Sequence, residues 1–239
     1  MDITASAKNA PDNPIVETSE WRNARLKLLQ LEKEETHLRD RVRAARQALP
    51  WVKVDKDYAF ETLAGRKTFA ELFDGRSQLL VYHFMLGPDW DEGCIGCSFF
   101  CDHVEGALPH LNNHDVTWVA VSRAPLDKIE AYRKRMGWSL RWVSSLNNDF
   151  NFDYGVSFPP DEKGPKYNLE TQAPYGQEAP GLSAFRRGED GAIYRTYSTY
   201  ARGLDVLNGA YHLLDMTSKG RDEKELSFSM AWVRRHDRY

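Results

Sequence analysis

Residues 78–101 read QLLVYHFMLGPDWDEGCIGCSFFC and hold all three cysteines of the chain. The first eight of these residues are almost continuously apolar, which is typical of a strand covered on both faces, as in a parallel sheet. A short loop follows, and helical apolar spacing begins at Cys94. The segment therefore predicts a strand, a loop and a helix, with Cys94 and Cys97 at the point where the helix begins.

The flanking sequence extends this unit into an alternating pattern. Residues 116–121 predict a second buried strand, and Pro125 begins a helix that Gly137 ends. Residues 182–187 and 193–197 flank a Gly-rich turn and predict a β-hairpin, and residues 204–214 predict a closing helix. Strands that alternate with helices indicate an α/β fold with right-handed crossovers.

Four segments are expected along the chain. Residues 1–14 read as a flexible tail, 15–50 as a long helix, 51–216 as the α/β domain with a long loop at 159–181, and 217–239 as a charged extension. Ser19 is the expected N-cap of the long helix, and Pro50 ends it. Its apolar residues recur at intervals of three, four or seven: Trp21, Leu28, Leu31, Leu38, Val42, Ala45 and Leu49. This apolar face either packs on its own domain or forms the arm of a homodimer. The heptads alone are too few to decide between these two arrangements.

Composition limits the class of protein. The chain has 239 residues, of which 41% are hydrophobic and 28% charged, with a formal net charge of −3. Such a chain can build a core, and its near-neutral charge gives no basic footprint for nucleic acid. No apolar run approaches the roughly 20 residues that span a bilayer, and no secretory signal is visible. We therefore expect a soluble cytoplasmic protein without a nucleic-acid or membrane partner.

The pair Cys94-Ile-Gly-Cys97 has the spacing that dithiol redox chemistry requires. Backbone amides and the dipole at a helix N-terminus stabilise a thiolate at Cys94, which attacks a disulfide, and Cys97 resolves the mixed disulfide. Asp89, Asp91 and Glu92 precede the pair and oppose a thiolate, so at most a weak lowering of the pKa of Cys94 is expected. The expected partners are a protein or small-molecule disulfide or thiol and an unidentified electron donor, with no tightly bound cofactor.

Other readings of the cysteines stay open. Cys101 is expected to be a buried small side chain, although it could be a second resolving thiol or a metal ligand. His110 and His114 have a spacing that zinc sites use, whereas His83 on the buried strand reads as a core histidine. We expect no bound metal, but a metal-binding or carrier protein is the alternative from another class.

Several longer motifs resemble the DUF899 family of thioredoxin-like bacterial proteins, described as predicted dithiol–disulfide oxidoreductases. They lie within residues 16–225, at 79–90, 93–99, 119–126, 135–138, 142–145, 149–153 and 196–203. The resemblance implies a thioredoxin-like fold, with a central mixed sheet flanked by helices, a long N-terminal helix and a C-terminal extension. It also implies that Cys94 and Cys97 are the active dithiol.

Residues 119–156 are also similar to peroxiredoxins, which implies a rival activity as a thiol peroxidase, with a sulfenic acid at Cys94. The chain departs from that pattern, because no Ser or Thr lies between Pro88 and Cys94. Arg123 could supply the cation that polarises a peroxide, and Trp90 could shield a mixed disulfide from water. Pro180 is similar to the cis-proline that thioredoxins place beside the dithiol to dock substrate, and the alternative is a trans proline.

Overall fold

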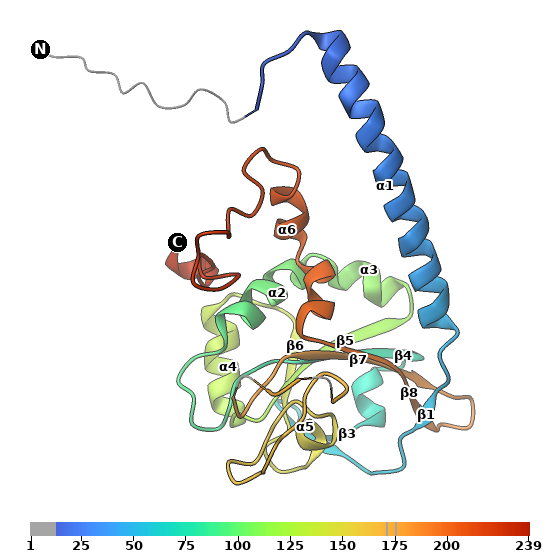
Figure 1. Ribbon diagram of the computed structural model, residues 1–239. Helices are drawn as coiled ribbons and strands as arrows, with labels where there is room; N and C mark the ends of the chain where they lie inside the picture. Colours follow the sequence, from blue (N-terminus) through green and yellow to red (C-terminus); the bar gives the residue numbers. More distant parts are fainter. Residues whose placement is uncertain (1–12, 171, 175) are drawn as a thin grey trace, which may run out of the picture. The chain divides into compact units, whose positions relative to one another are not determined.

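The computed structural model describes residues 13–170, 172–174 and 176–239. It divides into two units, Met1–Leu49 and Pro50–Tyr239. Most of the expected flexible tail, residues 1–12, lies outside the described residues. The first unit holds the helix α1 (Thr18–Gln47), of which no residue is buried (Figure 1). Its N-cap is Glu17, so the expected cap at Ser19 is wrong, since Ser19 already lies in the first helical turn.

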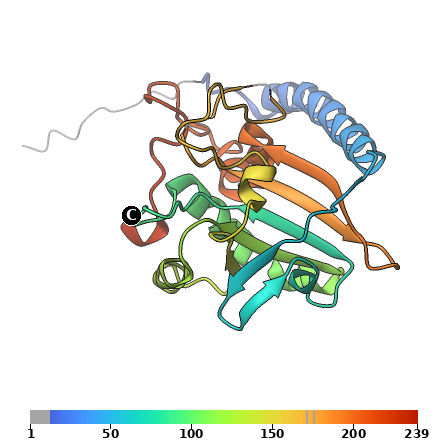
Figure 2. The ribbon, with the colours of Figure 1, turned by 90° about the horizontal axis from the view of Figure 1, so that it is seen from below.

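The second unit is built on one eight-stranded mixed sheet. Its strands are β1 (Val52–Lys53), β2 (Ala59–Thr62), β3 (Gly65–Thr68), β4 (Gln78–His83), β5 (Val116–Ser122), β6 (Arg141–Ser144), β7 (Gly181–Arg187) and β8 (Ile193–Tyr200). They are ordered β1-β8-β7-β4-β5-β6-β2-β3, and the hairpins β7–β8 and β2–β3 lie toward opposite ends of the sheet (Figure 2). β4, β5 and β6 are parallel, and β7 runs antiparallel to β4. The central order β8-β7-β4-β5 with this polarity is that of a thioredoxin-like fold, which confirms the expected fold class.

Helices cover both faces of the sheet. They are α2 (Ile95–Glu105), α3 (Leu108–Asn113), α4 (Leu126–Arg135), α5 (Phe150–Asp153) and α6 (Gly209–Leu214), with the 3-10 helices η1 (Ala70–Phe73), η2 (Ala201–Leu207) and η3 (His236–Arg238). α2 and α3 lie on one face and α5 on the other (Figure 1). The sheet has a hydrophobic core on each face. Consecutive side chains of β4 point to opposite faces, so they pack alternately in the two cores. Val81 packs with Phe150, whereas Tyr82 packs with Cys97 and Phe100.

Three elements differ from the expectations. The helix expected from Cys94 to about residue 112 ends at Gly106, and α3 begins at Leu108 with Pro109 in its first turn, because proline cannot donate the hydrogen bond that a continuous helix needs. The expected closing helix divides at Asn208 into η2 and α6. The β2–β3 hairpin was not expected. Within the described part of the chain, no helix has the length and apolar character needed to cross a membrane.

Candidate active site

The end of β4 positions both cysteines of the pair. The Cys94 amide donates to the Met85 carbonyl at 3.0 Å, and the Met85 amide donates to Cys97 Sγ at 3.4 Å. The loop between them returns to the sheet at Gly93, where a Cβ would lie 2.6 Å from Phe84 Cε1. Only glycine fits that approach, so residue 93 fixes how the chain enters α2. Cys94 is left half-buried at the N-cap, and Cys97 is buried.

The surroundings of Cys94 favour its thiolate. The pKa of Cys94 is lowered from 9.0 to about 7, chiefly by a hydrogen bond from the Cys97 thiol. The backbone amides of Cys97 and Gly96 and the charge of Arg235 lower the pKa further, while burial raises it. The two cysteines lie 3.8 Å apart, and both are free thiols. The reduced pair is therefore already within reach of a disulfide after a small movement.

Cys97 shows the opposite behaviour. Burial raises its pKa well above 9.0, and its hydrogen bond to Cys94 and the negative charge of that thiolate raise it further. The Tyr82 hydroxyl and the Met85 amide donate to Cys97 Sγ and partly oppose this rise. The site therefore separates two chemically identical groups into a half-buried thiolate and a buried protonated thiol.

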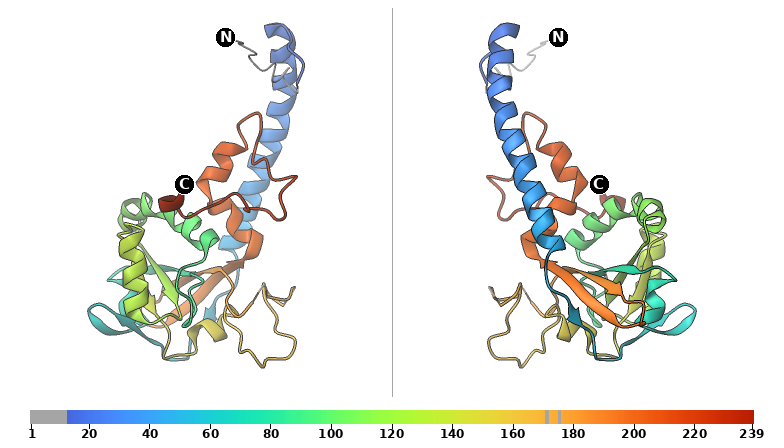
Figure 3. Two further views of the ribbon diagram at one scale, coloured as in Figure 1. Left: turned by 90° about the vertical axis from the view of Figure 1, so that its left-hand side faces the viewer. Right: turned by 90° about the vertical axis from the view of Figure 1, so that its right-hand side faces the viewer.

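A cation that sequence reasoning missed completes this site. Arg235 lies in the C-terminal strap, residues 230–238, which the views place beside α2 and α4 (Figure 3). Its Nη2 donates to the Gly93 carbonyl at 2.6 Å, and its Nε donates to the Tyr132 hydroxyl at 2.8 Å. Tyr132 in turn lies 2.8 Å from the hydroxyl of Ser98 on α2. The arginines at the end of the sequence indicate a local positive charge, but no sequence pattern relates them to Cys94.

Of the three carboxylates expected to oppose the thiolate, Glu92 is compensated by arginines. Glu92 pairs with Arg235 at 3.0 Å and also binds Arg135 and Arg238. These arginines hold the pKa of Glu92 below its usual range, the hydrogen bond from Arg135 being the largest cause. The negative charge of Glu92 is thus neutralised locally, and it does not prevent the lowering of the pKa of Cys94.

Trp90 and Arg123 occupy different surroundings. Trp90 is half-buried and packs against the core cluster that contains Cys97, and its carbonyl accepts a hydrogen bond from Lys128 at 3.3 Å. Arg123 forms an ion pair of 3.1 Å with the buried Glu178, and its guanidinium lies 4.2 Å from the centre of the Phe152 ring. The cation that acts on Cys94 is Arg235, and a supporting role for Arg123 or Trp90 stays a prediction.

The structure decides between the two forms considered for Pro180. The described residues contain no cis peptide bond, so the bond before Pro180 is trans. Its carbonyl accepts a hydrogen bond from the Tyr167 hydroxyl, and β7 begins at the next residue, Gly181, which pairs with His83 at the end of β4. Pro180 therefore lies directly before β7, beside the end of β4 that leads to Cys94. Its role in docking substrate stays a prediction.

The remaining candidates do not form a metal site. Cys101 is fully buried, and burial raises its pKa well above 9.0. His110 and His114 are exposed, on α3 and directly after it. His83 is buried with Nε2 3.0 Å from the Ser183 hydroxyl, and burial lowers its pKa to about 3. Among residues 13–170, 172–174 and 176–239, no three His, Cys, Asp or Glu side chains are grouped to hold a metal ion.

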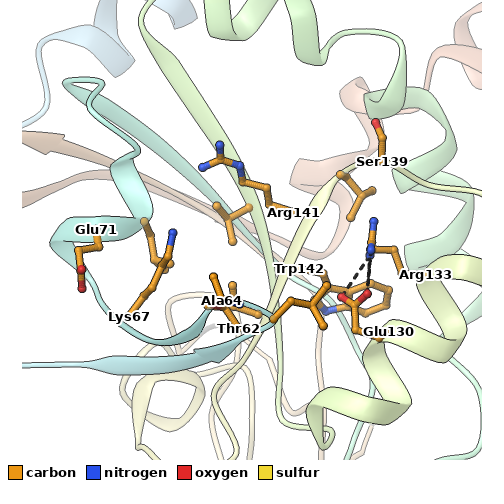
Figure 4. A pocket seen from close by; sticks show the side chains of 14 residues that line it. Thr62, Ala64, Lys67, Glu71, Glu130, Arg133, Ser139, Arg141 and Trp142 are labelled. Carbon is orange, nitrogen blue, oxygen red and sulfur yellow. Dashed lines mark hydrogen bonds and ion pairs between the residues drawn. The ribbon is translucent and has the colours of Figure 1, made fainter.

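A cavity of about 350 Å³ lies elsewhere, between the β2–β3 hairpin, β6 and α4 (Figure 4). Its buried charge is already paired, because Glu130 binds Arg133 at 2.7 Å on its wall. Arg141, which also lines it, binds Asp74. None of the three cysteines is among its lining residues, so the dithiol is not part of this cavity.

Comparison with known proteins gives a family match and distant structural similarities. The model of the family described as "Bacterial protein of unknown function (DUF899)" matches residues 10–239. No protein with a curated description matches. Peroxidoxin BcpB from Mycobacterium tuberculosis has 10% identity and a TM-score of 0.46, with 70% of this chain and 97% of that chain covered. PrxQ from Xylella fastidiosa has 12% identity and a TM-score of 0.44, with coverages of 68% and 95%. Yeast mitochondrial 1-Cys peroxiredoxin has 13% identity and a TM-score of 0.43, with coverages of 69% and 76%.

Proposed function

The chain belongs to the DUF899 family of bacterial proteins of unknown function, and we propose that it is a thiol–disulfide oxidoreductase with Cys94 as nucleophile and Cys97 as resolving thiol. One observation carries the proposal. Cys94 lies half-buried at the N-cap of α2, 3.8 Å from the buried Cys97, and a hydrogen bond from the Cys97 thiol is the largest cause of the lowering of the pKa of Cys94 to about 7. A thiolate is the attacking species in disulfide exchange, and attack is most efficient when its pKa is near the ambient pH.

The first step forms a mixed disulfide. The Cys94 thiolate attacks one sulfur of a substrate disulfide, a bond forms between Cys94 Sγ and that sulfur, and the other sulfur leaves as a thiolate. Cys94 is half-buried and its neighbour Ile95 is exposed, so an incoming chain can reach Cys94 Sγ from this side. Attack removes the negative charge of Cys94 and its role as acceptor of the Cys97 hydrogen bond.

The second step follows from that loss of charge. Both the charge of Cys94 and the hydrogen bond to it raise the pKa of Cys97, so both effects disappear in the mixed disulfide. The Tyr82 hydroxyl and the Met85 amide still donate to Cys97 Sγ and stabilise its thiolate. Cys97 then gives up its proton and attacks Cys94 Sγ, the substrate leaves as a thiol, and a Cys94–Cys97 disulfide remains. The substrate gains two electrons, and a thiol reductant then returns two electrons to the protein.

A redox titration tests this proposal. The protein is equilibrated in graded buffers of reduced and oxidised glutathione, quenched with acid and denatured. Its free thiols are then labelled with a maleimide, and labelled peptides are counted by mass. We expect two thiols, those of Cys94 and Cys97, to be lost together while Cys101 stays free. If all three thiols stay free across the range, disulfide exchange at this pair is wrong.

Two variants separate the steps. Cys97→Ser is expected to accumulate a mixed disulfide at Cys94 with a model disulfide, because the resolving thiol is missing. Cys94→Ser is expected to form none, and Cys101→Ser is the matched control that keeps both steps. Full activity in Cys94→Ser would reject the assignment of the nucleophile.

A thiol peroxidase uses the same two cysteines, and Arg235 is the observation that favours it as the second candidate. A cation beside the reactive thiol can polarise a peroxide, and the charge of Arg235 already lowers the pKa of Cys94. Hydrogen peroxide and a thiol reductant are therefore added in a parallel assay. If the protein consumes peroxide, forms a sulfenic acid at Cys94 and does not exchange with disulfides, its function is that of a thiol peroxidase.

A further inference from the structure

The helix α1 exposes an apolar face along its length. None of its 30 residues is buried, and Leu31 on that face is 61% exposed. Most of the stability of a protein helix comes from packing its apolar face against another element, and contiguous exposed apolar surface usually marks an interaction site. The face of α1 is therefore expected to have a partner.

The spacing of this face is that of a heptad repeat. With Trp21 placed at position a, seven of the eight a and d positions within the helix are apolar. The a positions are Trp21, Leu28, Glu35 and Val42, and the d positions are Ala24, Leu31, Leu38 and Ala45. Two further leucines, Leu26 and Leu29, fall at positions f and b, off this seam. A sustained a/d seam is the pattern with which helices pair as coiled coils.

The charges beside the seam select the partner. In a parallel, in-register pair of identical helices, position g of one helix faces position e of the following heptad of the other. The four facing pairs are Glu20 with Arg25, Lys27 with Glu32, Glu34 with Arg39 and Arg41 with Arg46. Three of these four pairs have opposite charge, so a second copy of the same helix is an electrostatically complementary partner.

The opposite orientation is disfavoured by the same residues. In an antiparallel pair of full overlap, e faces e and g faces g. Glu32 would then face Glu32 of the second copy, Glu34 would face Glu34, and Lys27 would face Arg41. These are all like charges. We propose that α1 is a dimerisation element, which pairs with α1 of a second copy of this chain as a parallel, in-register, two-stranded coiled coil.

One residue of the seam is charged. Glu35 occupies an a position, where it meets its own counterpart in the parallel pair, and it binds Arg39 of its own helix. A polar residue at a single a position costs stability but fixes the register, because only the in-register pairing lets the two polar side chains meet. Glu35→Leu is therefore expected to tighten the dimer.

The first test is the mass of the full chain in solution, measured by sedimentation equilibrium over a range of concentrations. Leu38→Glu, at a d position, is expected to give a monomer. Leu26→Glu is the matched control, because Leu26 and Leu38 are 49% and 50% exposed but Leu26 lies off the seam, and it is expected to stay dimeric. A monomeric wild-type chain, or equal effects of the two variants, would overturn the proposal.

A second test distinguishes pairing from misfolding. Lys27→Glu and Glu32→Lys each place like charges across the dimer and should raise its dissociation constant by about threefold to tenfold. The double variant restores opposite charges and should return it toward the wild-type value, whereas a merely damaged helix would not recover. Ala24→Cys then reports orientation, since the parallel dimer brings the two new cysteines together and oxidation should join them. Failure to join them in a dimer would overturn the parallel arrangement.

Discussion

The Arg235 guanidinium donates a hydrogen bond of 2.6 Å to the carbonyl of Gly93, the residue immediately before Cys94. The two residues are 142 positions apart in the chain, so only the folded structure joins them. This contact brings a positive charge to the first turn of the dithiol helix, and that charge lowers the pKa of Cys94. Four consequences of this site and its supports can be measured.

Removing this cation should weaken the thiolate. Without the positive charge, the pKa of Cys94 in Arg235→Gln should rise, and its alkylation by iodoacetamide at pH 7 should slow by about twofold, because the charge of Arg235 lowers this pKa less than the hydrogen bonds to Cys94 do. Rates are followed by mass spectrometry of the Cys94 peptide. Arg202→Gln is the control, because the Arg202 side chain is 91% exposed. Equal rates in wild type and Arg235→Gln would show that the charge of Arg235 does not act on Cys94.

The pH dependence of alkylation should separate the cysteines. Thiolate forms as pH rises through the pKa, so the rate at Cys94 should reach half its maximum near pH 7. Cys97 and Cys101 should stay unlabelled at that pH, because burial raises their pKa values well above 9.0. The folded-state pKa of Cys94 lies below its ordinary 9.0, so its contribution to stability is absent below about pH 7 and grows up to about pH 9. A half-maximum near pH 9 would contradict the assigned environment.

A methyl group at residue 93 should disturb the entry to α2. In Gly93→Ala the new Cβ would meet Phe84 at 2.6 Å and Tyr132 at 2.8 Å, and such overpacking should destabilise the fold by about 2 kcal/mol. Gly106→Ala is the matched control, since nothing lies within 4 Å of its Cβ position. Urea unfolding of both variants measures the difference. Similar midpoints for Gly93→Ala and Gly106→Ala would refute the close approach.

Arg123 should support the fold and leave the reactivity of Cys94 unchanged. Arg123→Met leaves the Glu178 carboxylate, which is 3% exposed, without its ionic partner, so we expect a loss of about 2–4 kcal/mol in unfolding free energy. Lys166→Met breaks an exposed ion pair and should cost less than about 1 kcal/mol. The alkylation profile of Cys94 should be the same in Arg123→Met as in wild type. A shifted profile would instead place Arg123 in the active site.

The sequence predicts the parts of this fold that local pattern specifies. The apolar run of β4, the cysteine pair at the start of α2 and the end of α4 at Gly137, where φ is +66°, all follow from periodicity and turn chemistry. The break at Asn208 and the β2–β3 hairpin do not, although local hydrogen bonds of the Thr62 hydroxyl with Gly65 and Ala64 hold the hairpin turn. Arg235 could not be assigned to Cys94, because no periodicity links residues so far apart.

The same separation has a consequence for how the protein is made. A ribosome delivers α2 and its two cysteines long before it delivers residue 235, and domains fold from the N-terminal side during synthesis. A growing chain therefore carries the dithiol without the guanidinium that favours ionisation of Cys94. The contribution of Arg235 to the low pKa of Cys94 is therefore present only after residue 235 has been translated and its hydrogen bond to Gly93 has formed.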